Sequence, residues 1–564
     1  MKRFLRITLG VVLVLLLTMA VAMAAEGDKK SGAFSYRLKG NGTAVITGYD
    51  GANEDVYVPR MVDGYTVTEI GENALSSVGK HIITLPDTIT VIGNQAFQGC
   101  KASVIIIPDS VQSIGDFAFQ SCSNIQTVSI PASVERIGTG AFSYCSSIKE
   151  YYVDSQNAVY ATIDGVLYNK QKKELVVFPQ GEYSQKKASI PSGIESIASY
   201  AFVGMENYYF NLPDTIKTIG DYAFANITFS YPETGIQLPA ALEHIGNHAF
   251  EGAKLKLVKF GSNLKTIGDY AFSYAWMYTD SERGKWEIIY QSYWYRDLIL
   301  PDSIQAIGEA AFQGIHGLHN IDLSKTQIKI IEPRTFMNVK SVWNKDISYG
   351  DTTILLPSSV QEIKEEAFFK AELGDIKMEN AELESIGKQA FAEVDMSNID
   401  FSGVKIKEIK EEAFLKAKTF HINIDDVKRI DERAFANATT YDIHIGNVEM
   451  IGEQAFANAS IETISIGDNV KEIGDQAFYN CNFRQKVFTL PSTVATIGSE
   501  VFKDASGLET ITIPASVERI GEDLCNKANV VLEVEKGSYA EMYALENGYQ
   551  IKREENADTS WLNN

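Results

Sequence analysis

The sequence predicts a solenoid in which short parallel β-strands stack, coil upon coil, along a curved rod. Three observations support this fold class. The motif Ile-Gly-x-x-Ala-Phe, counted on its leading isoleucine, occurs eighteen times, and most copies are 21 to 24 residues apart. A unit of that length cannot bury its own apolar face and must stack on its neighbours. Apolar residues alternate ahead of most copies, and a proline then ends the predicted strand.

One coil shows the expected order of elements. Val128 and Ile130 alternate with a polar residue and predict a strand with two inward side chains. Pro131 ends that strand, and 11 of the 14 prolines occupy this place in their coils. Gly138 permits a tight corner. The segment at Phe142 is expected to form a short 3₁₀ or α turn.

The aromatic position predicts the core. It is Phe in sixteen of the eighteen copies, and the exceptions, Leu75 and Cys525, occur in the first and last copies. Atypical units are expected where a stack must end. Coils about 4.8 Å apart would place the Ile, Ala and Phe side chains in buried ladders.

The repeated pattern resembles the BspA-like class of bacterial leucine-rich repeats, whose units of about 23 residues read LxxIxIPxxVxxIGxxAFxxC. The similarity covers about residues 60–530. It implies a leucine-rich repeat solenoid that is secreted or displayed at the cell surface and that binds host or neighbouring-cell molecules. Repeats between about 376 and 466 depart from the pattern because they lack the proline.

The N-terminus predicts export. Residues 1–24 carry Lys2, Arg3 and Arg6, then an apolar run, then the cleavage pattern Ala-Met-Ala. This is typical of a signal peptide whose removal leaves no membrane span, and the alternative is an uncleaved anchor. Residues 25–59 are expected to form a polar linker, up to Ser31, and an N-terminal cap.

The solenoid is expected over residues 60–529, with hairpin insertions at about 149–187, 274–295 and 340–353. The first insertion is interpreted as a decorated repeat that pairs with the main sheet, with a binding protrusion as the alternative. The C-terminus predicts a cap strand and helix over 530–551. Residues 552–564 are polar and are expected to be disordered.

The second and third insertions are rich in aromatic residues, which make good contacts for sugars and for protein partners. The alternative is that the rings pack on their own hairpin and on the coil beneath. The candidate ligand-binding residues are Trp276, Tyr278, Trp286, Tyr290, Tyr293, Trp294 and Trp343.

The net charge and the motifs of the chain limit the classes of function that are expected. The formal net charge is −22, which disfavours nucleic acid and anionic membranes as partners. The five cysteines are expected to be buried thiols. The pairs His244/His248 and His316/His319 have metal-ligand spacing, but their places in the repeats disfavour a metal site. No nucleophile, phosphate-loop or zinc-protease motif occurs, so no enzyme activity and no cofactor are expected.

The middle residue of each main strand, such as Ser129, Asn423 or Ser465, is expected to face outward and to build a broad polar surface. Such a surface suits a large or extended partner. We therefore expect a monomeric binding protein or adhesin, secreted or at the cell surface, that recognises an extracellular protein or glycan. The alternative is a structural spacer without a specific ligand.

Overall fold

The computed structural model describes residues 27–51, 55–79, 82–181, 188–208, 210–229, 236–255, 258–277, 297–318, 320–341 and 353–553. The chain divides into two compact units, Met1–Ile227 and Thr228–Asn564. Within the described ranges nearly every element is a strand, and the one helix is α2 (Tyr539–Glu546). None of these residues forms a helix long and apolar enough to cross a membrane. The predicted signal peptide lies outside them.

The first unit begins with a small sheet that covers the edge of the first coil. Its first strands are β1 (Lys29–Ser31), β2 (Phe34–Leu38), β3 (Thr43–Tyr49), β5 (Met61–Val62) and β6 (Tyr65–Ile70). β4 (Val56–Tyr57) lies in a separate sheet, where it pairs with the first main strand. β1, β2 and β3 pair antiparallel, and β3 then runs parallel to β6 with Ile46 opposite Ile70. The predicted linker is therefore three residues too long, because β1 occupies Lys29–Ser31.

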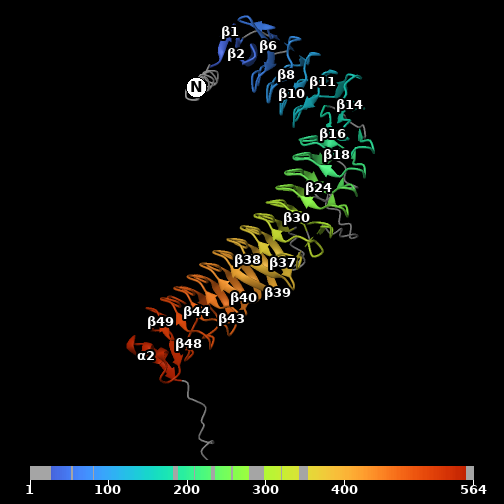
Figure 1. Ribbon diagram of the computed structural model, residues 1–564. Coiled ribbons are helices and arrows are strands. Elements are labelled where there is room, and N and C mark those ends of the chain that lie inside the picture. The colour runs from blue at the N-terminus through green and yellow to red at the C-terminus, as the bar shows by residue number, and fades with distance from the viewer. Residues whose placement is uncertain are drawn as a thin grey trace, which may run out of the picture. The chain divides into compact units, whose positions relative to one another are not determined.

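Each coil of the first unit contains a main strand, a short second strand and a turn (Figure 1). The main strands include β7 (Ile82–Thr84), β9 (Val104–Ile106), β11 (Thr127–Ile130) and β13 (Glu150–Val153). The second strands include β8 (Val91–Ile92), β10 (Ser113–Ile114), β12 (Arg136–Ile137), β18 (Ser196–Ile197) and β21 (Thr218–Ile219). The pairing between coils is parallel and in register, so Ile114 lies between Ile92 and Ile137.

The turn that carries the phenylalanine differs from the expected 3₁₀ or α piece. In the coil of Phe97, the N–H of Ala96 donates to the oxygen of Gly93 at 3.4 Å. Gln95, between them, has φ of 54°, as at the third position of a type II β-turn. The N–H of Phe97 donates instead to Ala118 of the next coil at 2.7 Å. Because N–H groups that donate within the coil alternate with N–H groups that donate to the next coil, no continuous helical run forms. The expectation of a 3₁₀ or α piece was therefore wrong.

The phenylalanine rings stack face to face in the core, as predicted. In the second unit, the ring centroids of Phe414 and Phe435 are 4.7 Å apart with planes at 3°. Phe435 and Phe456 follow at 5.0 Å and 4°. In the first unit, Phe97 and Phe119 are 5.0 Å apart at 6°. All five side chains are buried, so the ladder forms the centre of both units.

The first insertion continues the solenoid. It forms the antiparallel strands β14 (Tyr160–Ile163), β15 (Val166–Asn169) and β16 (Glu174–Val177). Asp164 and Gly165 have φ of 51° and 76° and make the turn of the predicted hairpin. β16 pairs in parallel with β18, with Leu175 opposite Ile197. β13, at the start of the same insertion, pairs in parallel with the main strand β11. The interpretation as a decorated repeat that pairs with the main sheet is therefore confirmed, with two strands more than a hairpin.

The coils without proline have the longest strands of the second unit. In this region the main-strand row includes β35 (Thr353–Leu356), β37 (Glu372–Met378), β39 (Asp395–Ile409), β40 (Lys418–Ile430), β41 (Thr439–Ile445) and β43 (Ser460–Ile466). β39 spans 15 residues and β40 spans 13, because no proline separates the main strand from the second strand.

The C-terminal end is closed by a second small sheet and by α2. The strands are β46 (Val487–Thr489), β48 (Thr510–Ile513), β50 (Val531–Val534) and β51 (Gln550–Arg553), paired in that order. Ser538 Oγ accepts the N–H of Glu541 at 3.1 Å and caps the helix, as predicted. β51 ends at Arg553, so the predicted disordered tail starts two residues too early. Residues 554–564 lie outside the described ranges.

Candidate binding site

Few of the aromatic residues singled out in the sequence fall within the described ranges. Trp276 lies in β28 (Trp276–Met277), which pairs with β25 (Lys254–Leu255) and β31 (His316–Leu318). The other candidates lie outside the described residues, so the patch that they form stays a prediction. They are Tyr278, Trp286, Tyr290, Tyr293, Trp294 and Trp343.

Tyr274, at the start of the second insertion, packs on the neighbouring coil. Its side chain is 49% exposed, and Gln313 Nε2 donates to its hydroxyl at 3.3 Å. A methyl group at Gly314 would come within 2.6 Å of the Tyr274 ring. For this ring, packing on the coil beneath explains the position without a ligand.

A polar row runs along the main strands of the second unit. The middle residues of β39, β40, β41 and β43 point outward, as the sequence predicted. Asn423 Nδ2 donates to Ser402 Oγ at 2.7 Å, and His444 Nδ1 lies 2.7 Å from Ser465 Oγ. Because neighbouring coils hold these side chains in register, the row presents donors and acceptors in a fixed order. Its members are Asp400, Asn423, His444 and Ser465.

Two exposed aromatic side chains stand beside this row, and neither is among the residues predicted from the sequence. Phe420 is 56% exposed and Tyr441 is 55% exposed. They occupy equivalent places on β40 and β41, since Thr419 pairs with Thr440 and the next residues pair as His421 with Asp442. A signal was present in the sequence: aromatic residues 21 positions apart, outside the Phe slot.

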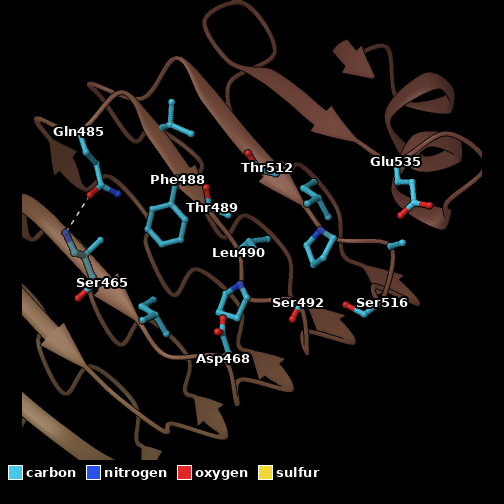
Figure 2. Close-up of a pocket in the computed structure, with 17 residues that line it drawn as sticks. Ser465, Asp468, Gln485, Phe488, Thr489, Leu490, Ser492, Thr512, Ser516 and Glu535 are labelled. Carbon is cyan, nitrogen blue, oxygen red and sulfur yellow. Dashed lines mark hydrogen bonds between the residues drawn. The ribbon is translucent and has the colours of Figure 1, made fainter. Parts of the chain in front are cut away.

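The row leads into a cleft where the main-strand ladder breaks between β43 and β46. Eight positions separate Phe456 from Ile464, but ten separate Phe478 from Phe488 in the next coil. The longer connection moves β46 into a separate sheet. The side chain of Gln485 bridges the break, because its Oε1 accepts the N–H of Ile464 at 3.0 Å (Figure 2).

The two coils remain joined on their other sides, so the cleft is open on the main-strand face alone. The rings of Phe478 and Phe502 stack at 5.2 Å and 5°, and Ile473 of β44 (Glu472–Ile473) pairs with Ile497 of β47 (Thr496–Ile497). The cavity has a volume of about 760 Å³, which lies within the usual range for ligand sites.

The opening changes the environment of two core isoleucines. Ile443 and Ile445 of β41 are 2% and 0% exposed. Their equivalents in β43, Ile464 and Ile466, are partly exposed and line the cleft. Hydroxyl groups and two carboxylates also line the cleft (Figure 2). The labelled polar residues are Ser465, Asp468, Gln485, Thr489, Ser492, Thr512, Ser516 and Glu535.

On the turn side of the same unit, charged groups pair with each other between coils. Glu393 lies 3.4 Å from Lys370 Nζ and 3.2 Å from Lys416 Nζ. Although partial burial opposes the shift, hydrogen bonds from the two lysines hold the pKa of Glu393 below its usual range. These pairs satisfy much of the charge there and leave the strand face as the better candidate for binding.

The described histidines of the two pairs have local partners. His244 Nδ1 lies 2.8 Å from Thr266 Oγ1. His248 Nδ1 lies 2.9 Å from Glu251 Oε2, and its ring stacks on Tyr270 at 4.9 Å. Among the residues that the structure places, no group of three or more His, Cys, Asp or Glu side chains could hold a metal ion.

The five cysteines are free and buried, as the sequence predicted. Burial raises the pKa of Cys100 and that of Cys481 to about 12. The Cys481 thiol also donates to the oxygen of Phe456 at 2.8 Å. A thiol with a raised pKa stays protonated at neutral pH and is a poor nucleophile.

We therefore expect no reaction of the native protein with Ellman's reagent at pH 8, and reaction of all five thiols after unfolding in guanidinium. Thiols in the narrow core become accessible only when coils separate. Rapid labelling of the native protein would contradict the burial of the five cysteine side chains.

Comparison with known proteins identifies the repeat. A family model described as BspA type leucine rich repeat region matches residues 68–182, 176–280, 287–355, 350–447 and 428–535. A search of curated proteins found no match.

Similar solved structures include a leucine-rich repeat protein from Bacteroides ovatus, with 19% identity over 94% of this chain and 100% of that chain and a TM-score of 0.36. A leucine rich cell surface protein from Faecalibacterium prausnitzii has 20% identity over 57% and 96%, with a TM-score of 0.28. The pneumococcal vaccine antigen PcpA has 19% identity over 68% and 94%, with a TM-score of 0.33. Similarities this distant assign no partner to any residue of the chain.

Proposed function

The chain belongs to the family of BspA-type leucine-rich repeat proteins, and from this premise we propose that it is a secreted or cell-surface binding protein for an extracellular protein or glycan. The observation that carries the proposal is the exposed pair Phe420 and Tyr441 beside the polar row of the main strands. Aromatic faces stack on sugar rings and anchor protein interfaces, and flanking polar groups fix the partner's orientation.

The exposure of Phe420 and Tyr441 favours a partner for this pair. Both side chains leave more than half of their surface in water, where each forgoes the stabilisation that burial gives to an aromatic ring. The neighbouring coils lack this feature, because the equivalent of Phe420 is Ser397 in β39 and Glu462 in β43. The pair is thus a local departure from the repeat, and it adds nothing to the stacked core.

The predicted aromatic insertion belongs to the same proposal. Trp276, Trp286 and Trp294 would add a second contact region if their rings face a partner. The alternative function, a structural spacer without a specific ligand, needs neither aromatic region.

The test is a glycan array and a set of immobilised matrix proteins, probed with the full chain and two variants. We expect Phe420→Ala with Tyr441→Ala to weaken binding by about tenfold or more, as the loss of aromatic anchors does at other interfaces. Trp276→Ala with Trp286→Ala and Trp294→Ala tests the insertion separately. Tyr57→Ala, at a 66% exposed tyrosine of the first unit, is the matched control and should bind like the parent.

Unchanged binding by both aromatic variants would remove these residues from the site. Failure of the parent protein to retain any ligand across the array would favour the spacer. Circular dichroism of each variant should match the parent, because none of the described residues that are changed is a member of the Phe ladder.

A further inference from the structure

The edge of β43 that faces the cleft has main-chain groups without a partner. The oxygen of Glu462 accepts the N–H of Gln485 at 3.1 Å, and the N–H of Ile464 donates to the Gln485 side chain. Glu462 and Ile464 therefore point their main-chain groups toward the next coil, and Ile466 does the same, because the groups of successive residues alternate between the two edges of a strand. Among the described residues, the oxygen of Ile464 and both main-chain groups of Ile466 have no partner.

The edge of β46 that faces β43 also has unpaired main-chain groups. The oxygen of Lys486 accepts the N–H of Thr510 at 3.1 Å, and the N–H of Leu490 donates to β48 at 3.0 Å. Since Lys486 and Leu490 point toward β48, Val487 and Thr489 point their main-chain groups into the cleft. The N–H and C=O groups of these two residues have no partner in the part of the chain that the structure describes. Two strand edges thus face each other across the cleft.

The side chain of Gln485 replaces part of a neighbouring strand. Its Oε1 accepts the N–H of Ile464 at 3.0 Å (Figure 2), as a main-chain carbonyl does where two coils pair. In the preceding coil, by contrast, β41 pairs with β43 from Thr439 to Ile445. The side chains of Ile464 and Ile466 are partly exposed, whereas their equivalents in β41 are buried. One more strand beside β43 would satisfy the main-chain groups and cover the apolar side chains.

The cleft has room for such a strand. A strand residue in a packed sheet occupies about 160 Å³, from a rise of about 3.3 Å, a strand spacing of about 4.8 Å and a sheet spacing of about 10 Å. The cleft volume of about 760 Å³ includes the part that continues past the ends of β46 and β48 to Ser492 and Ser516. That volume corresponds to about four residues of an extended chain.

We propose that an extended segment of a partner polypeptide binds in this cleft as an additional β-strand between β43 and β46. The inference rests on the proposed binding function and names the partner class at this site. Main-chain hydrogen bonds to Ile466, Val487 and Thr489 hold the segment, and its apolar side chains at alternate positions pack beside Ile464 and Ile466.

A sugar chain fits this cleft less well than a polypeptide. It lacks the N–H and C=O groups at strand spacing that the two edges require. The one aromatic residue of the lining, Phe488, is 3% exposed and offers no ring face for stacking. The main-chain groups therefore favour a polypeptide as the occupant.

The experiment measures fluorescence anisotropy of three labelled, end-capped heptapeptides with the full chain. The first has isoleucine at alternate positions, in the order Ser-Thr-Ile-Thr-Ile-Thr-Ser. The second has the same composition with the two isoleucines adjacent. The third is the first peptide with an N-methyl group on each isoleucine, which removes two amide N–H groups and leaves every side chain in place.

The protein variants are Val487→Pro and, as matched control, Val487→Ala. Proline removes the N–H that faces the cleft and keeps the hydrogen bonds between β46 and β48, which use the other edge of β46. Alanine removes the 51% exposed side chain and keeps the N–H. A third variant, Phe420→Ala with Tyr441→Ala, changes residues outside the cleft lining.

We expect the alternating peptide to bind the parent protein at least about tenfold more tightly than the other two peptides, because only it can pair on both edges with its apolar side chains on one face. Val487→Pro should weaken that binding by about tenfold, and Val487→Ala and Phe420→Ala with Tyr441→Ala should leave it unchanged. Added salt should change the binding little, because the hydrogen bonds join uncharged groups.

Equal binding of the N-methylated peptide would overturn the additional strand, and equal binding of the peptide with adjacent isoleucines would overturn the alternation. No binding of any of the peptides would overturn the inference. A dimer of the protein that the alternating peptide dissociates would assign the cleft to a second copy and would also overturn it. If Val487→Pro fails to fold, the N-methylated peptide still decides the outcome. If the peptides fail while the array detects a ligand that depends on Phe420 and Tyr441, this inference falls and the proposed function stands.

Discussion

Phe435→Ala is expected to lower the free energy of unfolding by about 3–5 kcal/mol, the usual range for truncating a buried phenylalanine. The side chain is 1% exposed and lies between Phe414 at 4.7 Å and Phe456 at 5.0 Å. The cavity cannot collapse easily, because hydrogen bonds fix the coils on either side. The N–H of Phe435, for example, donates to Ala455 of the next coil at 2.7 Å.

The matched control is Phe420→Ala, the same substitution at a phenylalanine that is 56% exposed. We expect its effect on the free energy of unfolding to stay within about 0.5 kcal/mol. Because coils contact only their neighbours, unfolding can proceed in segments, so urea unfolding should be followed together with hydrogen exchange of the adjacent coils. Equal losses for the two variants would contradict the burial of the ladder.

Gly507→Ala is expected to cost at least about 3 kcal/mol, because it combines a strained backbone with a clash against main-chain atoms. Gly507 has φ of 91°, and an added methyl group would come within 1.7 Å of the oxygen of Phe483 in the preceding coil. Neither atom can move without breaking the stack, since the N–H of Phe483 donates to Ser506 at 3.0 Å.

Gly64→Ala separates the cost of the strained backbone from the cost of the clash with main-chain atoms. Gly64 has φ of 87°, but a methyl group there would meet nothing within 4 Å. We expect a loss of about 1–2 kcal/mol from the left-handed conformation alone. The measurement is the change in melting temperature and in urea midpoint for each variant. Similar losses at the two glycines would mean that the coils at Phe483 and Gly507 do not approach as closely as described.

The core could be predicted because its signal repeats. Most coils place Ile, Ala and Phe at the same positions, so eighteen weak signals reinforce one another. The conformation of the turns could not be predicted in the same way. Left-handed residues usually favour Gly or Asn, whereas this chain has Gln95, Tyr222 and Glu412 in that conformation. Hydrogen bonds between coils hold them there, and a single repeat shows no sign of those bonds.

The candidate site could be predicted only in part. The outward polar row follows from strand alternation, and the sequence therefore predicts Asn423 and Ser465 on the surface. The cleft depends on two extra residues between Phe478 and Phe488, which fall within the normal variation of repeat length. Phe420 is exposed because it and His421 both face outward, an irregularity that strict alternation does not predict.

The most direct test of the central claim, a stack of coils in fixed register, is disulfide formation between engineered cysteines. Asn458 and Asn480 occupy equivalent places in neighbouring coils, and Asn480 Nδ2 donates to Asn458 Oδ1 at 2.8 Å. Asn458→Cys with Asn480→Cys should bridge on mild oxidation, because facing positions in adjacent coils lie about 4.8 Å apart. Asn437→Cys with Asn480→Cys, two coils apart, should not bridge. Mass spectrometry that finds both cross-links, or neither, would contradict the stack.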